Sequence, residues 1–310
     1  MRSDSAEVAG RAGARREETV DVDQFLLVLV SGLASGAVYG LMGLGLVIIF
    51  RATDVVNFAL ASLATVGLYA ALTLYDRGMP LLLTAVAAIV VTAATGLVAR
   101  ETVIRRLAQG ELLSALVMTM GVSLIAESVI STIWDDQPRL FPSLVEGSVS
   151  LGDSAIPTQS LLTIAVAAVA MALVAYLFGR TTIGSAMRAV AESADTAQIL
   201  GLGSQRIARI AWALGLGLAA LAAFLYAPRA GLVPTVLSAP LFRAFAGIFL
   251  GGLTSMYGAV IGGLTVGVLD NLAASYVSAG YRDSFVFSFT ILVLLIRPQG
   301  LFGVRTFQRV

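Results

Sequence analysis

The chain has 310 residues, of which 58% are hydrophobic and 13% are charged, and its formal net charge is +1. Soluble domains carry about 25% charged residues, so this composition excludes an ordinary soluble domain, and the small net charge implies no strong attraction to nucleic acid. The chain has no cysteine, histidine or lysine, which excludes disulfides, cysteine- or histidine-based metal sites, histidine bases and Schiff-base lysines.

Residues 1–23 differ from the rest of the chain. They are polar, mixed in charge and nearly free of large apolar side chains. Such a composition favours disorder. The acidic residues just before the first apolar run, and the length of that run, argue against a secretory signal. We expect a disordered, exposed N-terminal tail.

Eight apolar segments follow, at roughly 25–50, 57–75, 79–98, 112–133, 160–178, 207–227, 241–269 and 284–296. Several of them reach the ~20 residues that a helix needs to cross a bilayer core of about 30 Å. The sequence therefore predicts an all-α integral membrane protein, a polytopic helical bundle of about eight apolar segments. We expect a transmembrane domain over 24–303 and a short tail over 304–310.

The charges between these segments predict an orientation. Loops 99–111 and 179–206 and the tail after 296 are rich in arginine, whereas loop 134–159 is acidic and contains three prolines. Because cytoplasmic loops carry an excess of basic residues, the three arginine-rich regions are expected in the cytoplasm and loop 134–159 outside.

Counting crossings leaves a mismatch at both ends of the chain. From an inside N-terminus, three segments cannot reach an inside loop 99–111, and two segments cannot return the chain from outside residue 228 to an inside C-terminus. Both regions are rich in glycine, so we expect broken or re-entrant helices or one additional crossing there. An outside N-terminus would resolve the first mismatch alone, and the glycines could instead serve close helix packing. The glycines singled out are Gly251, Gly252, Gly258, Gly262 and Gly263.

Residues 181–203 form a long loop with the pattern of an amphipathic helix. Small apolar residues recur at helical spacing, Arg188 and Glu192 lie four residues apart on another face, and Gly201 suits a helix end. The helix could lie on the membrane surface or fill a groove on a soluble partner. We favour docking, because small residues suit close backbone contact.

Four ordered motifs resemble one transporter family. They are GLASGAVYGLMGLGLVIIFRATDVVNFA (32–59), RAVAESADTAQILGLG (188–203), GIFLGGLTSMYGAVIGGLTVG (247–267) and RPQGLFG (297–303). In this order they are similar to the opening span, coupling loop, glycine-rich stretch and C-terminal signature of the inner-membrane permeases of branched-chain amino acid ABC transporters. The resemblance covers about residues 25–303.

The resemblance implies a pore-forming subunit of an ATP-driven importer in the bacterial inner membrane. Such a permease pairs with a second, homologous permease, with two cytoplasmic ATPases and with an extracytoplasmic substrate-binding protein. Without lysine the chain cannot contain the phosphate loop G-x-x-x-x-G-K-[ST], so we expect it to bind no cofactor and its partners to hydrolyse the ATP.

One departure from the family bears on the substrate. The family commonly continues Asn-Phe-Ala with His-Gly, where this chain has Leu60 and Ala61. The family also includes permeases for urea and short amides. The sequence therefore leaves open whether the substrate is a branched-chain amino acid or another small neutral solute, and whether the pore is a homodimer or a heterodimer.

Five polar residues are candidates for the substrate pathway: Tyr39, Asn57, Glu127, Asp270 and Asn271. Glu127 lies in an apolar run, where an ionisable group usually faces a cavity or a partner, although it could sit near the outer interface. Asn57 matches the family's asparagine. Core packing for Tyr39 and a helix end for Asp270 and Asn271 are the alternatives. Coupling to an ATPase is assigned to Arg188, Glu192 and Gly201.

Two other classes of protein were weighed against the importer subunit. A stand-alone secondary transporter or channel would need a coupling site, for which Glu127 is the one deep acid available. A membrane enzyme is disfavoured, because these spans offer no histidine, cysteine or lysine from which to build a nucleophile and its base.

Overall fold

The computed structural model describes the backbone of residues 3–107, 112–151 and 154–303, and the side chains of 23–106, 113–150, 155–193 and 196–303. The helices in chain order are α1 (Ser3–Thr53), α2 (Leu60–Asp76), α3 (Leu81–Ala99), α4 (Arg105–Leu107), α5 (Leu112–Trp134), α6 (Thr158–Arg180), α7 (Thr182–Glu192), α8 (Ala194–Ile199), α9 (Ser204–Ala230), α10 (Ser238–Gly251), α11 (Met256–Leu272) and α12 (Arg282–Ile296). Single π-helical turns, Arg100–Ile104 and Ala273–Val277, extend α3 and α11. The prediction of an all-α polytopic membrane protein is confirmed.

Within this described part, six helices are long and apolar enough to cross a membrane: Asp23–Thr53, Leu81–Ile104, Leu113–Trp134, Thr158–Arg180, Ser204–Ala230 and Met256–Val277. Helices α2 and α10 are shorter and apolar. Strands β1 (Ser148–Leu151) and β2 (Ser154–Pro157) pair antiparallel, with Ser148 opposite Pro157, in the segment predicted to be non-helical. Helix α1 begins at Ser3, inside the segment whose composition favoured disorder. The division into a 1–23 tail, a 24–303 domain and a 304–310 tail stays a prediction.

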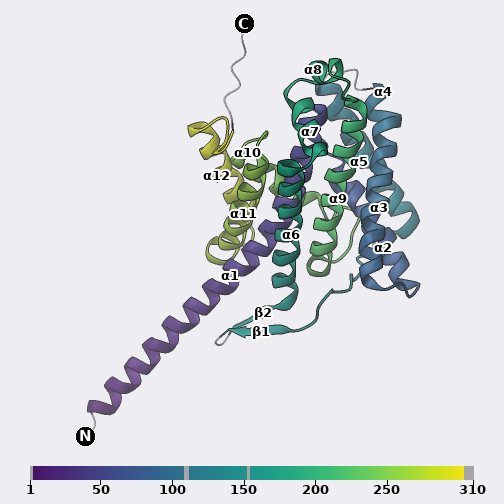
Figure 1. The fold of residues 1–310 in the computed structure, drawn as a ribbon. Helices are drawn as coiled ribbons and strands as arrows, with labels where there is room; N and C mark the ends of the chain where they lie inside the picture. Colours follow the sequence, from purple (N-terminus) through teal and green to yellow (C-terminus); the bar gives the residue numbers. More distant parts are fainter. Residues whose placement is uncertain (1–2, 108–111, 152–153, 304–310) are drawn as a thin grey trace.

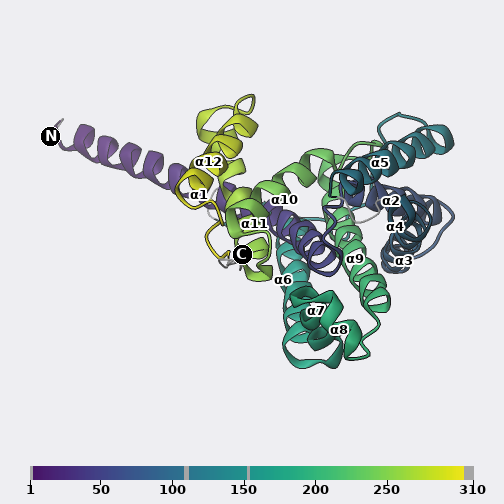
Figure 2. The ribbon, with the colours of Figure 1, turned by 90° about the horizontal axis from the view of Figure 1, so that it is seen from above.

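Helix α1 is the axis of the bundle. Seen from above, it runs through the middle, with α10, α11 and α12 on one side and α2, α3 and α5 on the other (Figure 2). The most apolar window of α1 is 89% buried inside the protein, whereas the windows of α3 and α6 are each 22% buried. The outer helices therefore leave their apolar side chains for lipid or for another subunit.

The two ends of each helix can be assigned to faces of the bundle (Figure 1). Helices α4, α7 and α8 and the C-terminal end of α12 lie at one face, which we call the basic face. The β1–β2 hairpin and the N-terminal end of α1 lie at the opposite face. Ion pairs and hydrogen bonds from Glu101 to Arg209 and from Arg100 to Gln205 join the ends of α3 and α9 at the basic face. The described parts of the three arginine-rich regions therefore share one face.

This arrangement removes both mismatches in the count of crossings. The broken helix expected in the first glycine-rich region is not formed, because α1 runs unbroken through it. Helix α1 starts at the opposite face, so α1, α2 and α3 carry the chain in three passes to loop 99–111. At the other end, the apolar segment 241–269 is broken into α10 and α11, as the glycine content predicted. Gly252 ends α10 with a φ of 107°, and the Ser255 hydroxyl accepts a hydrogen bond from the Gly258 amide to begin α11.

Glycines hold these helices together by direct backbone contact. A methyl group added at Gly267 would lie 2.2 Å from the Cα of Gly36, and one at Gly263 would lie 2.5 Å from the Cα of Gly40. These glycines let α11 approach α1 more closely than any side chain would allow. Gly251, Gly258 and Gly262 similarly bring α10 against α11. Of the five singled-out glycines, Gly252 forms the break and the other four serve packing.

The glycine contacts predict opposite effects for two Gly→Ala substitutions. Gly267→Ala places a methyl group against the backbone of α1 and should lower the free energy of unfolding by about 1–3 kcal/mol. Gly121→Ala, on α5, meets nothing within 4 Å and should leave stability unchanged or raise it by about 0.5–1 kcal/mol. Thermal unfolding of the detergent-solubilised protein, monitored by size-exclusion chromatography, measures the stability of both variants. Equal midpoints for the two variants would contradict the contact.

Candidate functional site

A stripe of polar side chains runs along one face of α5. Thr119, Ser123, Glu127 and Ser131 are spaced four residues apart, so they lie one above another on the helix. The Thr119 hydroxyl lies 3.3 Å from the carbonyl oxygen of Val56, in the break between α1 and α2. We call these four residues the α5 stripe. The stripe connects that break with the opposite face of the bundle.

Hydroxyl groups link the middle of the stripe to its acid. The Ser62 hydroxyl of α2 donates to Ser123 at 2.9 Å, and Ser123 donates to the Glu127 carboxylate at 3.3 Å. Ser62 and Thr119 are almost fully buried, whereas Glu127 is partly exposed. The stripe is therefore closed toward the centre of the bundle and open toward the opposite face.

Glu127 opens into a groove of about 730 Å³. The groove is lined by Leu124, Glu127, Ser128, Ser131, Thr132 and Asp136 from α5 and the residues after it, and by Val233, Pro234 and Thr235 after α9. Its volume falls in the range of about 300–1,000 Å³ that is usual for small-molecule sites. Glu127 lies seven residues from the end of α5, about 10 Å into the span. Among the described side chains, no arginine pairs with it.

The other four pathway candidates lie away from this groove. Asn57 is buried in the α1–α2 break, where its Oδ1 accepts from the Ala59 amide at 3.0 Å and its Nδ2 has no partner among the described residues. The Asn271 amide nitrogen donates to the carbonyl oxygen of Gly267 within α11. Their role in a pathway stays a prediction.

Tyr39 and Asp270 meet in a buried ionic cluster. The Tyr39 hydroxyl donates to Asp270 at 3.2 Å, Arg243 Nε lies 3.0 Å from the same carboxylate, and Arg282 pairs with both of its oxygens. Arg243 also pairs with Asp283 at 2.5 Å. Asp270 is fully buried, and the four charges sum to zero. The cluster ties α1, α10, α11 and α12 together, so the protein itself supplies the partners of both candidates.

Sequence reasoning missed the two arginines of this cluster. Arg243 and Arg282 are 27 and 12 residues from Asp270, and only the antiparallel arrangement of α10, α11 and α12 brings them to it. A charge at membrane depth requires a partner of opposite sign. That rule could have prompted a search for an arginine in the apolar segment 241–269.

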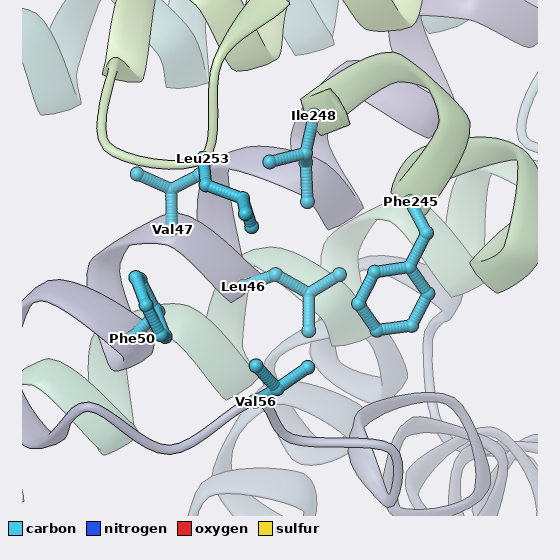
Figure 3. Close-up of a pocket in the computed structure, with 7 residues that line it drawn as sticks. All are labelled: Leu46, Val47, Phe50, Val56, Phe245, Ile248 and Leu253. Atoms are coloured by element: carbon cyan, nitrogen blue, oxygen red, sulfur yellow. The ribbon is translucent and has the colours of Figure 1, made fainter. Parts of the chain in front are cut away.

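A small apolar cavity lies where the two helix breaks meet (Figure 3). Leu46, Val47 and Phe50 of α1, Val56 of the first break, Phe245 and Ile248 of α10 and Leu253 of the second break line it. Its volume of about 10 Å³ is no more than a single water needs, and no polar group lines it. It cannot hold a solute the size of an amino acid.

Residues 181–203, the predicted coupling loop, fold as two short helices, α7 and α8, where one amphipathic helix was expected. The coupling role of Arg188, Glu192 and Gly201 stays a prediction. Ser193 separates them and accepts a hydrogen bond from the Thr196 amide. Met187, Val190 and Ala197 are buried in the core of the protein itself, whereas the membrane surface or a soluble partner was expected to cover this apolar stripe. Ile183, at the start of the stripe, is exposed. Gly201 has a φ of 81° and ends α8, also as predicted.

The exposed surface of this loop has an apolar tip. Arg188 and Glu192 are exposed, and the Arg188 guanidinium donates to the Ser185 hydroxyl. Beyond them, Ile199 and Leu200 expose 85% and 73% of their surface at the end of α8. Two adjacent, large apolar side chains are therefore exposed beyond the ends of the spans.

Comparison with known proteins identifies relatives over nearly the whole chain. A family model described as "Branched-chain amino acid transport system / permease component" matches residues 28–296. The high-affinity branched-chain amino acid transport system permease protein BraD of Pseudomonas aeruginosa is 30% identical over 298 residues, covering 91% of this chain and 97% of the relative. LivH of Escherichia coli strain K12, described in the same words, is 29% identical over 90% of this chain and 96% of its own length. A probable branched-chain amino acid transport permease protein LivH of Methanocaldococcus jannaschii is 30% identical over 85% of this chain and 88% of its own length.

The ionic cluster predicts unequal effects for its two acids. Asp270→Asn leaves two arginines facing a neutral amide in a buried site and should lower the free energy of unfolding by about 3–5 kcal/mol. Asp283→Asn removes a largely exposed partner and should cost about 1 kcal/mol or less. The yield of folded protein and the midpoint of thermal unfolding in detergent measure both. Similar losses for the two acids would show that Asp270 does not hold the cluster together.

Proposed function

The chain belongs to the branched-chain amino acid transport system permease family, and from this premise we propose that it is the pore-forming subunit of an ATP-driven importer of branched-chain amino acids. The observation that most supports the proposal is the α5 stripe, a polar line along a mostly apolar span that opens into a groove at one face. The basic face, at the other end of the bundle, exposes the apolar tip of α8.

The groove suits a zwitterionic solute with an apolar side chain. The Glu127 carboxylate and the hydroxyls of Ser128 and Ser131 can accept hydrogen bonds from an ammonium group, while Leu124 and Val233 offer apolar contact. A urea or short-amide substrate would need no carboxylate. We therefore place the branched-chain amino acids ahead of urea and amides as substrates.

The basic face supports docking of an ATPase. Its arginines correspond to the excess of basic residues that cytoplasmic loops carry, so we place α7, α8 and the C-terminus in the cytoplasm and the β1–β2 hairpin outside. The Ile199–Leu200 pair then faces the compartment that contains ATP. Two ATPase subunits, a second homologous permease and an extracytoplasmic binding protein complete the proposed importer.

Substitution of Glu127 tests the pathway. Glu127→Gln keeps the shape of the side chain but removes its charge, so it should lower leucine uptake about tenfold by weakening the contact with the ammonium group. Glu146→Gln, in the exposed outer loop, is the matched control and should transport normally. The measurement is uptake of radiolabelled leucine and urea by cells or proteoliposomes with the partner subunits. Undiminished leucine uptake by Glu127→Gln would show that Glu127 is not part of the substrate pathway. It would also argue against proton coupling through Glu127.

Substitution at the apolar tip tests the coupling assignment. Burying an unpaired charge in the interface costs more binding free energy than losing the apolar contact does. Ile199→Asp and Leu200→Asp should therefore each abolish co-purification of the ATPase subunit. Thr182→Asp introduces the same charge at the exposed start of α7 and should leave co-purification intact. Chromatographic retention and thermal unfolding establish that each variant is folded. Retention of the ATPase by both tip variants would contradict docking there, and its absence from native complexes would overturn the importer proposal.

A further inference from the structure

A separate crevice lies on the outside of the bundle, near the basic face. It has a volume of about 530 Å³ and is walled by α6 and α11 with α1 as its floor. Both walls belong to outward-facing helices, so the crevice opens sideways toward the bilayer rather than along the α5 stripe.

The crevice has a charged mouth and apolar walls. Arg51 at the end of α1 and Arg188 of α7 line one end, together with Thr254 and Ser255 at the start of α11. Below them the walls are apolar over about two helical turns, about 12 Å along the membrane normal. The wall residues include Leu44, Met171, Val174, Phe178, Val260 and Ile261.

The two arginines lack acidic partners. Among the described side chains, no carboxylate lies within ion-pair distance of Arg51 or Arg188, and the Arg188 guanidinium donates to the neutral Ser185 hydroxyl. The amino-terminal end of α11 adds its partial positive charge at the same mouth. Two guanidinium groups without a counter-charge favour an anion, and a guanidinium binds a phosphate through paired hydrogen bonds.

We propose that this crevice binds an anionic phospholipid, with the headgroup phosphate between Arg51 and Arg188 and one acyl chain along α6 and α11. Basic pockets between membrane helices near the cytoplasmic surface accept such headgroups. An apolar helix from another subunit would instead bury the two guanidinium groups without an anion, which is costly. The bound lipid would link α7 of the coupling loop to the α10–α11 turn, because Arg188 and Ser255 share the mouth.

Lipid retention by the full-length protein, purified with the subunits that accompany it, tests the site. Native mass spectrometry in mixed phosphatidylglycerol and phosphatidylcholine detergent micelles should show preferential retention of phosphatidylglycerol. The Arg51→Gln and Arg188→Gln variants should each weaken that retention about tenfold, since a hydrogen bond to a charged group is lost. Arg106→Gln removes an exposed arginine from the same face outside the crevice and should retain the lipid as the parent chain does.

A substitution in the wall separates lipid from free phosphate. Ala175→Trp fills the apolar part of the crevice without touching either arginine, so it should also release the lipid. If Ala175→Trp has no effect and inorganic phosphate displaces the bound anion, the ligand is a soluble phosphate and the lipid proposal fails. Equal retention of phosphatidylglycerol and phosphatidylcholine would likewise overturn the lipid proposal. Arginine variants that lose the second permease but keep the lipid would also overturn it. None of these readouts depends on the substrate, so these experiments test the lipid site independently of the proposed transport function.

Discussion

The close approach of α1 to α11 at glycine is the contact on which the rest of this structure depends. Gly36 and Gly40 of α1 meet Gly267 and Gly263 of α11 with no side chain between them. Lipid tails are as apolar as the helices, so helices in a membrane associate through close packing and interhelical polar bonds rather than through the hydrophobic effect. Glycine at these positions makes α1 a buried axis, around which α9, α10 and α11 are arranged.

A single polar cluster complements this apolar packing at the end of α11. Asp270 sits between Arg243 and Arg282 and accepts a hydrogen bond from Tyr39 of α1. The cluster fixes the rotation of α10, α11 and α12 about the axis, because a buried carboxylate without its arginines would be costly. Helix α5, which contains the α5 stripe, lies on the other side of α1 from α10, α11 and α12 (Figure 2). The molecule therefore keeps its structural charges away from the groove that we propose for the solute.

Much of the fold followed from the sequence, whereas its long-range contacts did not. Apolar runs located the spans, and the break in 241–269 was expected because glycine is frequent there. Hydropathy still merged α10 with α11, since the turn from Gly252 to Ser255 contains no charge. Of the α5 stripe, only Glu127 was recognised. Serine and threonine are common inside membrane helices, so Ser123 carries a weak signal until its bond to Ser62 of another helix is seen. The partners of Gly36 and Asp270 depend on which helices become neighbours, and a single sequence does not specify this.

Every functional assignment depends on which face of the bundle lies in the cytoplasm. The chain has no cysteine, so single cysteines report on sidedness without background. A membrane-impermeant maleimide should label Arg77→Cys, at the exposed turn after α2, in intact cells, and should label Leu200→Cys only after the membrane is permeabilised. Labelling of Leu200→Cys in intact cells would contradict the proposed orientation, and with it the docking of an ATPase at α8.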